Sequence, residues 1–235
     1  SRADQLITPT PYAKELLEGY GIKVPICAIS NGIDLDKYRP EPKKEQAFRD
    51  YFQLSADQKV IISVGLYFER KGIVDFVEIA RHMPEYTFIW FGHTPMYTIP
   101  KAVRDLVKEN HPENVIFPGY IKGDVIEGAY SGADLFFFPS YEETEGIVVL
   151  EALASKQKVL VRDIPVYHGW LQENQNSYMG RTADEFAEQI ANIVEGRVPD
   201  LSAAGYQAAA ERSIEEIGKE LKKVYQSVLE EKPVD

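Results

Sequence analysis

Between residues 60 and 162, short apolar runs alternate with longer segments whose apolar residues recur at helical spacing. Apolar runs rich in β-branched and aromatic residues favour strands, whereas a 3.6-residue repeat is typical of amphipathic helices. The predicted strands cover 60–65, 86–92, 114–117, 134–139 and 158–162, and the predicted helices cover 72–83, 100–109, 124–131 and 146–155. Apolar strands separated by helices are typical of a parallel sheet covered on both faces. The pattern therefore predicts a doubly wound, mostly parallel, Rossmann-like α/β fold.

The segments that flank this alternation carry weaker patterns. Before it we expect strands at 3–8 and 25–29, a helix from Pro11, a turn-rich connector over 30–40 and a polar helix over 43–53. After it the chain is expected to be irregular to about Tyr178 and then helical over 183–195, 202–212 and 214–230. The last helix repeats apolar residues at helical spacing, so its apolar face must pack on something. We expect one domain over 1–235, with a helical extension from about 183.

Composition and charge narrow the class of protein. The 235 residues are 44% hydrophobic and 27% charged, as in an ordinary soluble globular protein. The longest apolar run, about 60–68, is shorter than the roughly 20 residues that a membrane-spanning helix needs. The single Cys27 excludes an intramolecular disulfide and is expected in a cytosolic protein. The net charge of −11 argues against a general nucleic-acid binder, because phosphate contacts need a basic surface. The first residues already resemble the approach to a strand, so we expect the chain to be part of a longer protein.

The stretch 136–154 combines a strand, an acidic loop and a helix, and it carries Glu143 and Glu151. These two carboxylates could be the acid and base of a glycosidase, or groups that hold the hydroxyls of a ligand. Glu151 lies among apolar residues, where a carboxylate is costly unless a donor pairs with it, and a hydroxyl-rich ligand would provide donors. Thr144, Glu145 and Gly146 present backbone N–H groups at a helix start, which suit phosphate or sugar oxygens.

A second candidate site follows the first strand of the alternation. Gly65 ends that strand, and Arg70 and Lys71 precede the next helix, where backbone N–H groups and the helix dipole favour anions. A solvated basic pair in a turn is the alternative interpretation. A phosphate-binding P-loop is excluded, because Arg70 replaces the second glycine and no Ser or Thr follows Lys71. The absence of a G-x-G-x-x-G sequence argues against a nicotinamide or flavin dinucleotide.

Metal-binding patterns are weak in this sequence. Asp34 and Asp36 form a D-x-D sequence, but they lie in the connector before Pro40 and are interpreted as turn residues. The four histidines show no metal-ligand spacing. His93 is the best placed of them for contact with a ligand, although a polar turn residue is the simpler interpretation. We expect no metal site.

Taken together, four motifs resemble one known family. They are Ser30-Asn-Gly-Ile-Asp34 with Pro40, Val64-Gly65 with Lys71-Gly72, Pro118-Gly119-Tyr120, and Pro139-Ser140-x-x-Glu143-x7-Glu151-Ala152. In this order they resemble the carboxyl-terminal, donor-binding domain of retaining GT-B glycosyltransferases of family 4. A complete GT-B enzyme also has an amino-terminal, Rossmann-like domain that binds the acceptor, and the resemblance implies that this chain lacks it.

The resemblance implies a role for each candidate residue. Arg70 and Lys71 would stabilise the leaving nucleoside diphosphate without a metal. Glu151 would accept hydrogen bonds from the ribose, while Glu143 and the backbone of Thr144, Glu145 and Gly146 would hold the donor sugar as stabilisers rather than as a nucleophile. The amides of Ile147 and Val148 would meet the phosphates. Tyr120 and Ile121 would frame the base, close to Gly65.

Departures from the family pattern point to a subgroup. Leu66 stands where an Arg is usual, Thr144-Glu145-Gly146 replaces Gly-Phe-Gly, and 162–171 replaces Gly-Gly-x-x-Glu. The last two variants are similar to Gram-positive glucosyltransferases that build glucosylated diacylglycerols. The resemblance thus implies transfer of a hexose, glucose from UDP-glucose, to a glycolipid or diacylglycerol. The implied partners are a nucleotide sugar and an acceptor sugar or lipid held by the absent domain, and the implied location is cytoplasmic, with peripheral contact at the inner face of the membrane.

Two other functions fit the same residues. One is a binding module that holds a nucleotide sugar without chemistry, as this chain alone would if the second wall of its cleft is missing. The other is a GT-B-shaped epimerase or phosphorylase, and a phosphorylase would need a lysine that carries pyridoxal phosphate.

Overall fold

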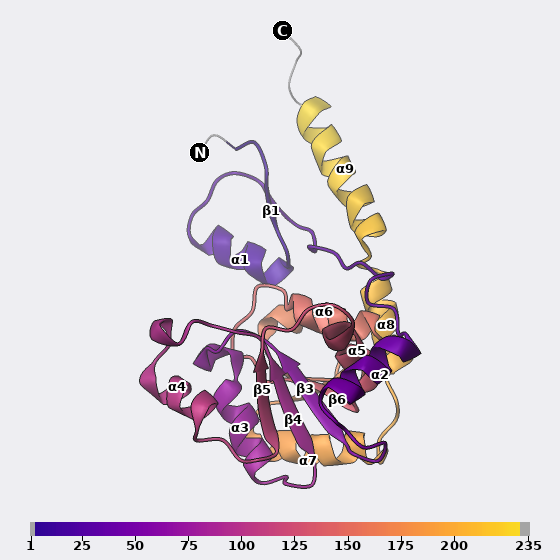
Figure 1. Cartoon of the computed structure of the whole chain (residues 1–235). Helices are drawn as coiled ribbons and strands as arrows, with labels where there is room; N and C mark the ends of the chain where they lie inside the picture. Colours follow the sequence, from indigo (N-terminus) through magenta and orange to yellow (C-terminus); the bar gives the residue numbers. More distant parts are fainter. Residues whose placement is uncertain (1–2, 231–235) are drawn as a thin grey trace.

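A computed structural model describes residues 3–230, and a parallel six-stranded sheet organises it (Figure 1). The strand order is β5-β4-β3-β6-β7-β8, and every neighbouring pair is parallel. The strands are β3 (Val60–Val64), β4 (Thr87–Phe91), β5 (Val115–Gly119), β6 (Leu135–Phe138), β7 (Val159–Arg162) and β8 (Tyr178–Gly180). The predicted doubly wound α/β fold is confirmed. Strand β8 was not predicted: it begins at Tyr178, where the predicted irregular stretch ends, is only three residues long, and pairs with β7 at the sheet edge.

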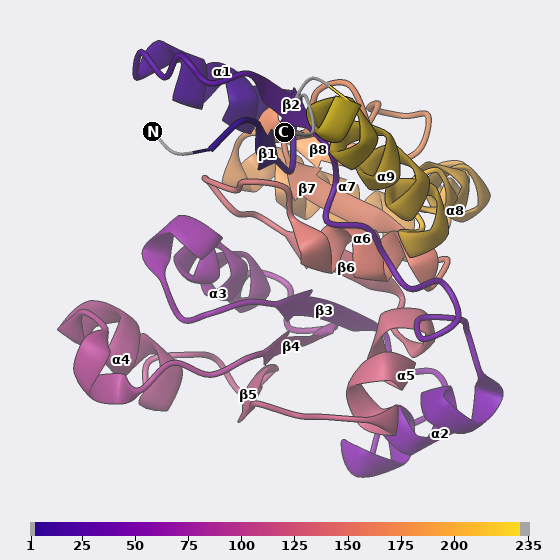
Figure 2. The same ribbon diagram turned by 90° about the horizontal axis from the view of Figure 1, so that it is seen from above.

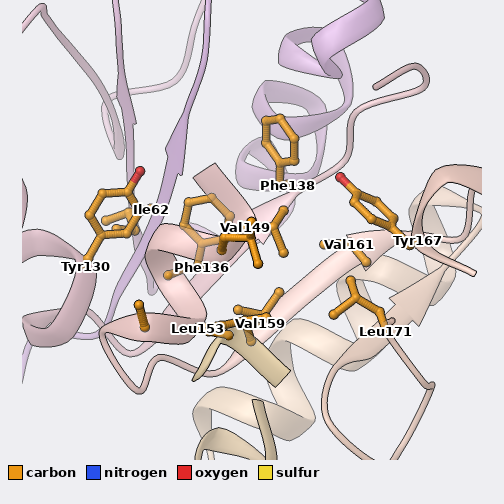
Figure 3. Packing of buried hydrophobic residues seen from close by; sticks show 14 of the residues in the cluster. Ile62, Tyr130, Phe136, Phe138, Val149, Leu153, Val159, Val161, Tyr167 and Leu171 are labelled. Carbon is orange, nitrogen blue, oxygen red and sulfur yellow. The ribbon is translucent and has the colours of Figure 1, made fainter. Parts of the chain in front are cut away.

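Helices cover both faces of this sheet, as the fully apolar strands require. Alternate strand residues point to opposite faces, so Ile62 and Phe136 pack on one side while Ile61 and Phe137 pack on the other. The first side, shown in Figure 3, is covered by α2 (Pro42–Tyr51), α5 (Asp124–Gly132), α6 (Ile147–Ala154) and α8 (Ser202–Ala210). The second is covered by α3 (Ile73–Arg81), α4 (Lys101–Lys108) and α7 (Ala183–Val194). Three short 3-10 helices, η1 (Glu69–Lys71), η2 (Met96–Thr98) and η3 (Pro165–Tyr167), lie in the connections.

The first strands and helix form a unit of their own. Strands β1 (Leu6–Thr8) and β2 (Ile26–Ala28) pair in parallel as a separate two-stranded sheet, with α1 (Pro11–Gly19) between them in the chain. Thr10 caps α1, because its side chain accepts a hydrogen bond from the amide of Ala13 at 3.2 Å. Figures 1 and 2 show this β1-α1-β2 unit beside the six-stranded sheet rather than within it. The predicted elements at 3–8 and 25–29 are therefore confirmed as strands, but they do not extend the main sheet.

The long helix α9 (Ile214–Glu230) extends away from the main sheet on the side of the β1-α1-β2 unit (Figure 1). Ile217 is buried in its first turn and Leu221, Val224 and Val228 are half-buried, whereas Tyr225 is 65% exposed. The predicted apolar face is therefore covered in part by the described residues, and Tyr225 is its exposed member. None of the helices in this described part of the chain is long and apolar enough to cross a membrane.

The contact between α2 and α5 depends on Gly128. A Cβ at this position would lie 1.9 Å from the carbonyl oxygen of Lys44, and that oxygen belongs to the backbone, so relieving the overlap requires the two helices to separate. We expect Gly128→Ala to lower the free energy of unfolding by about 1–3 kcal/mol. Thermal unfolding measures this as a lower Tm. Gly218→Ala in α9 is the matched control, since no atom lies within 4 Å of the added methyl, and it should leave Tm unchanged or raise it. Equal Tm values for the two variants would contradict the proposed contact.

Candidate functional site

A cleft of about 890 Å³ opens at the carboxyl ends of β3, β4 and β5. Parallel strands present their carboxyl ends at one edge, and α/β folds bind ligands there. Five residues that the sequence singled out line this large cleft, namely Gly65, Tyr120, Ile121, Val148 and Glu151. His93 also lines it, as does Leu66 in the place of the usual Arg. The cleft brings together residues from five separate segments of the chain.

Glu151 is held in the large cleft by two tyrosines that the sequence analysis did not identify. Tyr38, in the connector, donates a hydrogen bond to one carboxylate oxygen at 2.5 Å, and Tyr130, in α5, donates to the other. The two rings meet edge to face with their centroids 5.7 Å apart. Burial and the negative charge of Glu151 raise the pKa of both phenols, so the tyrosines remain donors at neutral pH.

The apolar surroundings of Glu151 therefore do not by themselves require a ligand. Tyr38 and Tyr130 supply the donors that its burial demands. Each carboxylate oxygen can still accept a further hydrogen bond, and the carboxylate lines the cleft. Its contact with ribose stays a prediction of the family resemblance.

A second cleft of about 610 Å³ lies between α1 and the main sheet, and it shares no lining residue with the first. Arg70, Lys71, Glu143 and Thr144 line this small cleft together. The Lys71 ammonium lies 2.5 Å from Glu143 Oε1, with 15% and 8% of the two side chains exposed. Ser140 also donates to Glu143 Oε1, at 2.8 Å. The cationic pair and the first glutamate are thus neighbours.

Gly72 allows Lys71 to approach the end of β6. Its φ of +78° is in the left-handed region, and a Cβ there would lie 2.3 Å from the carbonyl oxygen of Pro139. This close approach sets Lys71 beside Phe138, with its ammonium 5.5 Å from the ring centroid. Arg70 differs from Lys71 because it is exposed, and it donates only to the carbonyl of Glu142, at 3.3 Å.

The chain passes from the small cleft to the large one at the start of α6, because Thr144 lines the small cleft and Val148 lines the large one. Gly146 is its N-cap residue, with φ +84° and no side-chain cap. The amides of Ile147 and Val148 have no acceptor within the helix, because they belong to its first turn. No residue in 3–230 accepts a hydrogen bond from either amide, so both can donate to an anion.

Glu145 faces a different part of the molecule. Its carboxylate is 3% exposed and accepts from the backbone and side-chain nitrogens of Asn31, at 3.1 and 2.6 Å, and from the Ser30 hydroxyl. The side chain therefore ties the connector to the loop before α6. Any contact of Glu145 with a sugar would come from its backbone.

The connector aspartates behave as turn residues. Asp34 accepts a hydrogen bond from the amide of Lys37 at 3.0 Å, as a turn residue does. Within residues 3–230, no three His, Cys, Asp or Glu side chains gather where they could hold a metal ion.

The sequence of this chain matches a known protein family and several characterised enzymes. The family described as "Glycosyl transferases group 1" matches residues 44–212. The processive diacylglycerol alpha-glucosyltransferase of Acholeplasma laidlawii is 50% identical over 97% of this chain and 68% of its own length. The alpha-galactosylglucosyldiacylglycerol synthase of Streptococcus pneumoniae is 31% identical over 81% of this chain. The chain spans about half (51%) of that second relative.

Solved structures show the same fold. Sucrose-phosphate synthase from Thermosynechococcus elongatus superimposes with a TM-score of 0.85 over 98% of this chain and 60% of its own, at 23% identity. Anabaena HepE, solved in complex with UDP and glucose, gives a TM-score of 0.82 over 96% of this chain and 64% of its own, at 19% identity. The predicted resemblance to GT-B glycosyltransferases is confirmed. By its sequence match, the chain belongs to the group 1 glycosyl transferases.

Proposed function

We propose that this chain binds the nucleotide-sugar donor of a retaining hexosyltransferase that moves glucose from UDP-glucose to a glycolipid or diacylglycerol. The observation that supports this proposal most directly is that α6 starts between a large cleft lined by Glu151 and a smaller cleft lined by Lys71 and Glu143. The names of the Acholeplasma and Streptococcus relatives support a diacylglycerol-type acceptor.

Each cleft holds a different part of the donor. The nucleoside lies in the large cleft, where the ribose hydroxyls donate to Glu151 and the base rests near Tyr120 and Ile121. The diphosphate then meets the amides at the start of α6, which carry the positive end of the helix dipole. The hexose reaches the small cleft and Glu143.

In the transfer step, the bond between the anomeric carbon and the diphosphate oxygen breaks. An acceptor hydroxyl attacks the anomeric carbon from the same side of the sugar and gives its proton to the departing diphosphate oxygen. Negative charge develops on the departing UDP, and Lys71 and Arg70 lie on the side where it forms. These cations stabilise the negative charge on the leaving group, as a metal ion does in other enzymes. Glu143 acts as a stabiliser, because Lys71 and Ser140 already hold one of its oxygens.

Catalysis requires more than this chain. The chain spans 68% and 51% of the two relatives described above, so the acceptor would be held mainly by a part that it does not include. The chain alone is therefore expected to bind the donor without turning it over. A lipid acceptor would be met at the inner face of the cytoplasmic membrane by peripheral contact.

Donor binding is tested by the thermal stability of the chain. UDP and UDP-glucose, each at about 100 times its dissociation constant, should stabilise the fold by about 2.7 kcal/mol and raise Tm. The Tm shift with GDP-glucose shows whether the site distinguishes the base. The Tm shift with UDP-galactose shows whether it distinguishes the sugar. If neither UDP compound shifts Tm at millimolar concentration, the proposed donor site is wrong.

A further inference from the structure

Tyr167 is a buried phenol that the proposed transfer step does not use. It ends η3, it is 0% exposed, and its hydroxyl has no hydrogen-bond partner among the described residues. A buried hydroxyl without a partner is destabilising, so an unpaired one in a folded protein needs an explanation. Figure 3 shows this hydroxyl directed toward the side of the cluster where Phe138 ends β6. That is the end of the sheet where Glu143 and Lys71 meet.

The surroundings of the hydroxyl belong to the start of α6. A Cβ at Gly146 would lie 3.0 Å from the Tyr167 oxygen, so the phenol occupies space that only a glycine leaves open. Glu143 precedes Gly146 by three residues, and its negative charge adds to burial in raising the pKa of Tyr167. The phenol is thus a protonated donor in the field of this carboxylate.

A bound donor would change the partners of Glu143. In this structure the carboxylate accepts from Lys71 and Ser140 through one oxygen, and no hydrogen bond reaches the other oxygen from the described residues; 8% of the side chain is exposed. A diphosphate at the start of α6 would draw the Lys71 ammonium toward itself. Glu143 then keeps its charge with one fewer donor, and a buried carboxylate in that position is costly.

We propose that Tyr167 is a positioning residue whose hydroxyl donates to Glu143 when the diphosphate draws Lys71 away. This inference rests on the proposed function. It explains why the hydroxyl is unpaired in the free protein, since its partner becomes available only in the donor complex. Tyr167 keeps Glu143 in place beside the hexose while Lys71 serves the leaving group.

Removing only the hydroxyl tests this role. In the 235-residue chain, Tyr167→Phe should leave the Tm of the ligand-free protein unchanged or raise it, because an unpaired polar atom is lost. The same change should lower the affinity for UDP and for UDP-glucose by about tenfold, which is the contribution of one hydrogen bond to a charged group. Calorimetric titration measures these affinities. Uridine, which has no diphosphate to attract Lys71, should bind both proteins equally.

Tyr86→Phe is the matched control, because it removes a hydroxyl that is paired with Glu195 at 2.8 Å, outside both clefts. This variant should lower the ligand-free Tm and leave UDP affinity unchanged. If Tyr167→Phe behaves like Tyr86→Phe, Tyr167 is structural and the inference is overturned. If the wild type binds UDP and Tyr167→Phe binds it with the same affinity, only this inference is overturned. If the wild type does not bind UDP, the proposed function is overturned as well.

Discussion

Replacing Lys71 with alanine is expected to lower kcat with UDP-glucose by about 10²- to 10³-fold in the complete enzyme, the cost of losing one preorganised charge at a developing anion. Lys71 is mostly buried beside Glu143, so its charge acts on the small cleft with little screening by water. The donor KM should change less than kcat, because the charge on UDP grows as the bond breaks. Steady-state kinetics at varied UDP-glucose concentration separate the two parameters.

Lys59→Ala is the control for this experiment. Lys59 also forms an ion pair, with Asp134 at 3.0 Å, but it lies just before β3, at the opposite end of that strand from the clefts. Its loss should leave kcat within about twofold of wild type, as expected for an exposed pair. Equal kcat values for Lys71→Ala and wild type would show that Lys71 has no role in the transfer step.

Replacing Glu151 with alanine is expected to raise the donor KM by about 100-fold, because two charge-assisted hydrogen bonds to the ribose are lost. Turnover at saturating donor should fall less, since the ribose is remote from the bond that breaks. The change also leaves the hydroxyls of Tyr38 and Tyr130 without their acceptor, so Tm should fall.

Glu151→Gln distinguishes these two effects. The amide oxygen can still accept from a tyrosine, so this variant should keep more of the stability, but it lacks the charge that strengthens a ribose contact. A donor KM near the wild-type value in both variants would show that Glu151 serves only to hold the tyrosines.

The sheet was predictable because its strands are apolar on both faces. The residues of β3 form one continuous β-branched run interrupted only by Ser63, and the predicted and observed boundaries of that strand differ by one residue. Strand β8 was missed because three residues carry no period, and only its pairing with β7 defines it. The exposure of Tyr225 on α9 could not be foreseen either, since helical spacing shows that a face is apolar and not how completely its neighbours cover it.

The candidate site was predictable in its motifs and not in its contacts. Glu143 and Lys71 were each identified from their own segments, and the fold brings them together across 72 residues of sequence. Tyr38 lies 113 residues from Glu151, and nothing in the local pattern of either marks them as partners. The predicted role of Glu145 lies in its backbone, and nothing in the sequence indicates that its side chain contacts Asn31, 114 residues away. Neighbours in sequence at a helix start can direct their side chains to different parts of the molecule.

Helix α6 and the loop before it contact the connector at two places, through Glu145 with Asn31 and through Glu151 with Tyr38. The connector follows β2, so it joins the β1-α1-β2 unit to the main sheet. A ligand bound at α6 and a ligand bound on that unit would therefore act on the same few hydrogen bonds. Thermodynamic linkage makes such an effect equal in both directions. Any ligand of the unit that changes the affinity of α6 for its own ligand would have its affinity changed by the same factor.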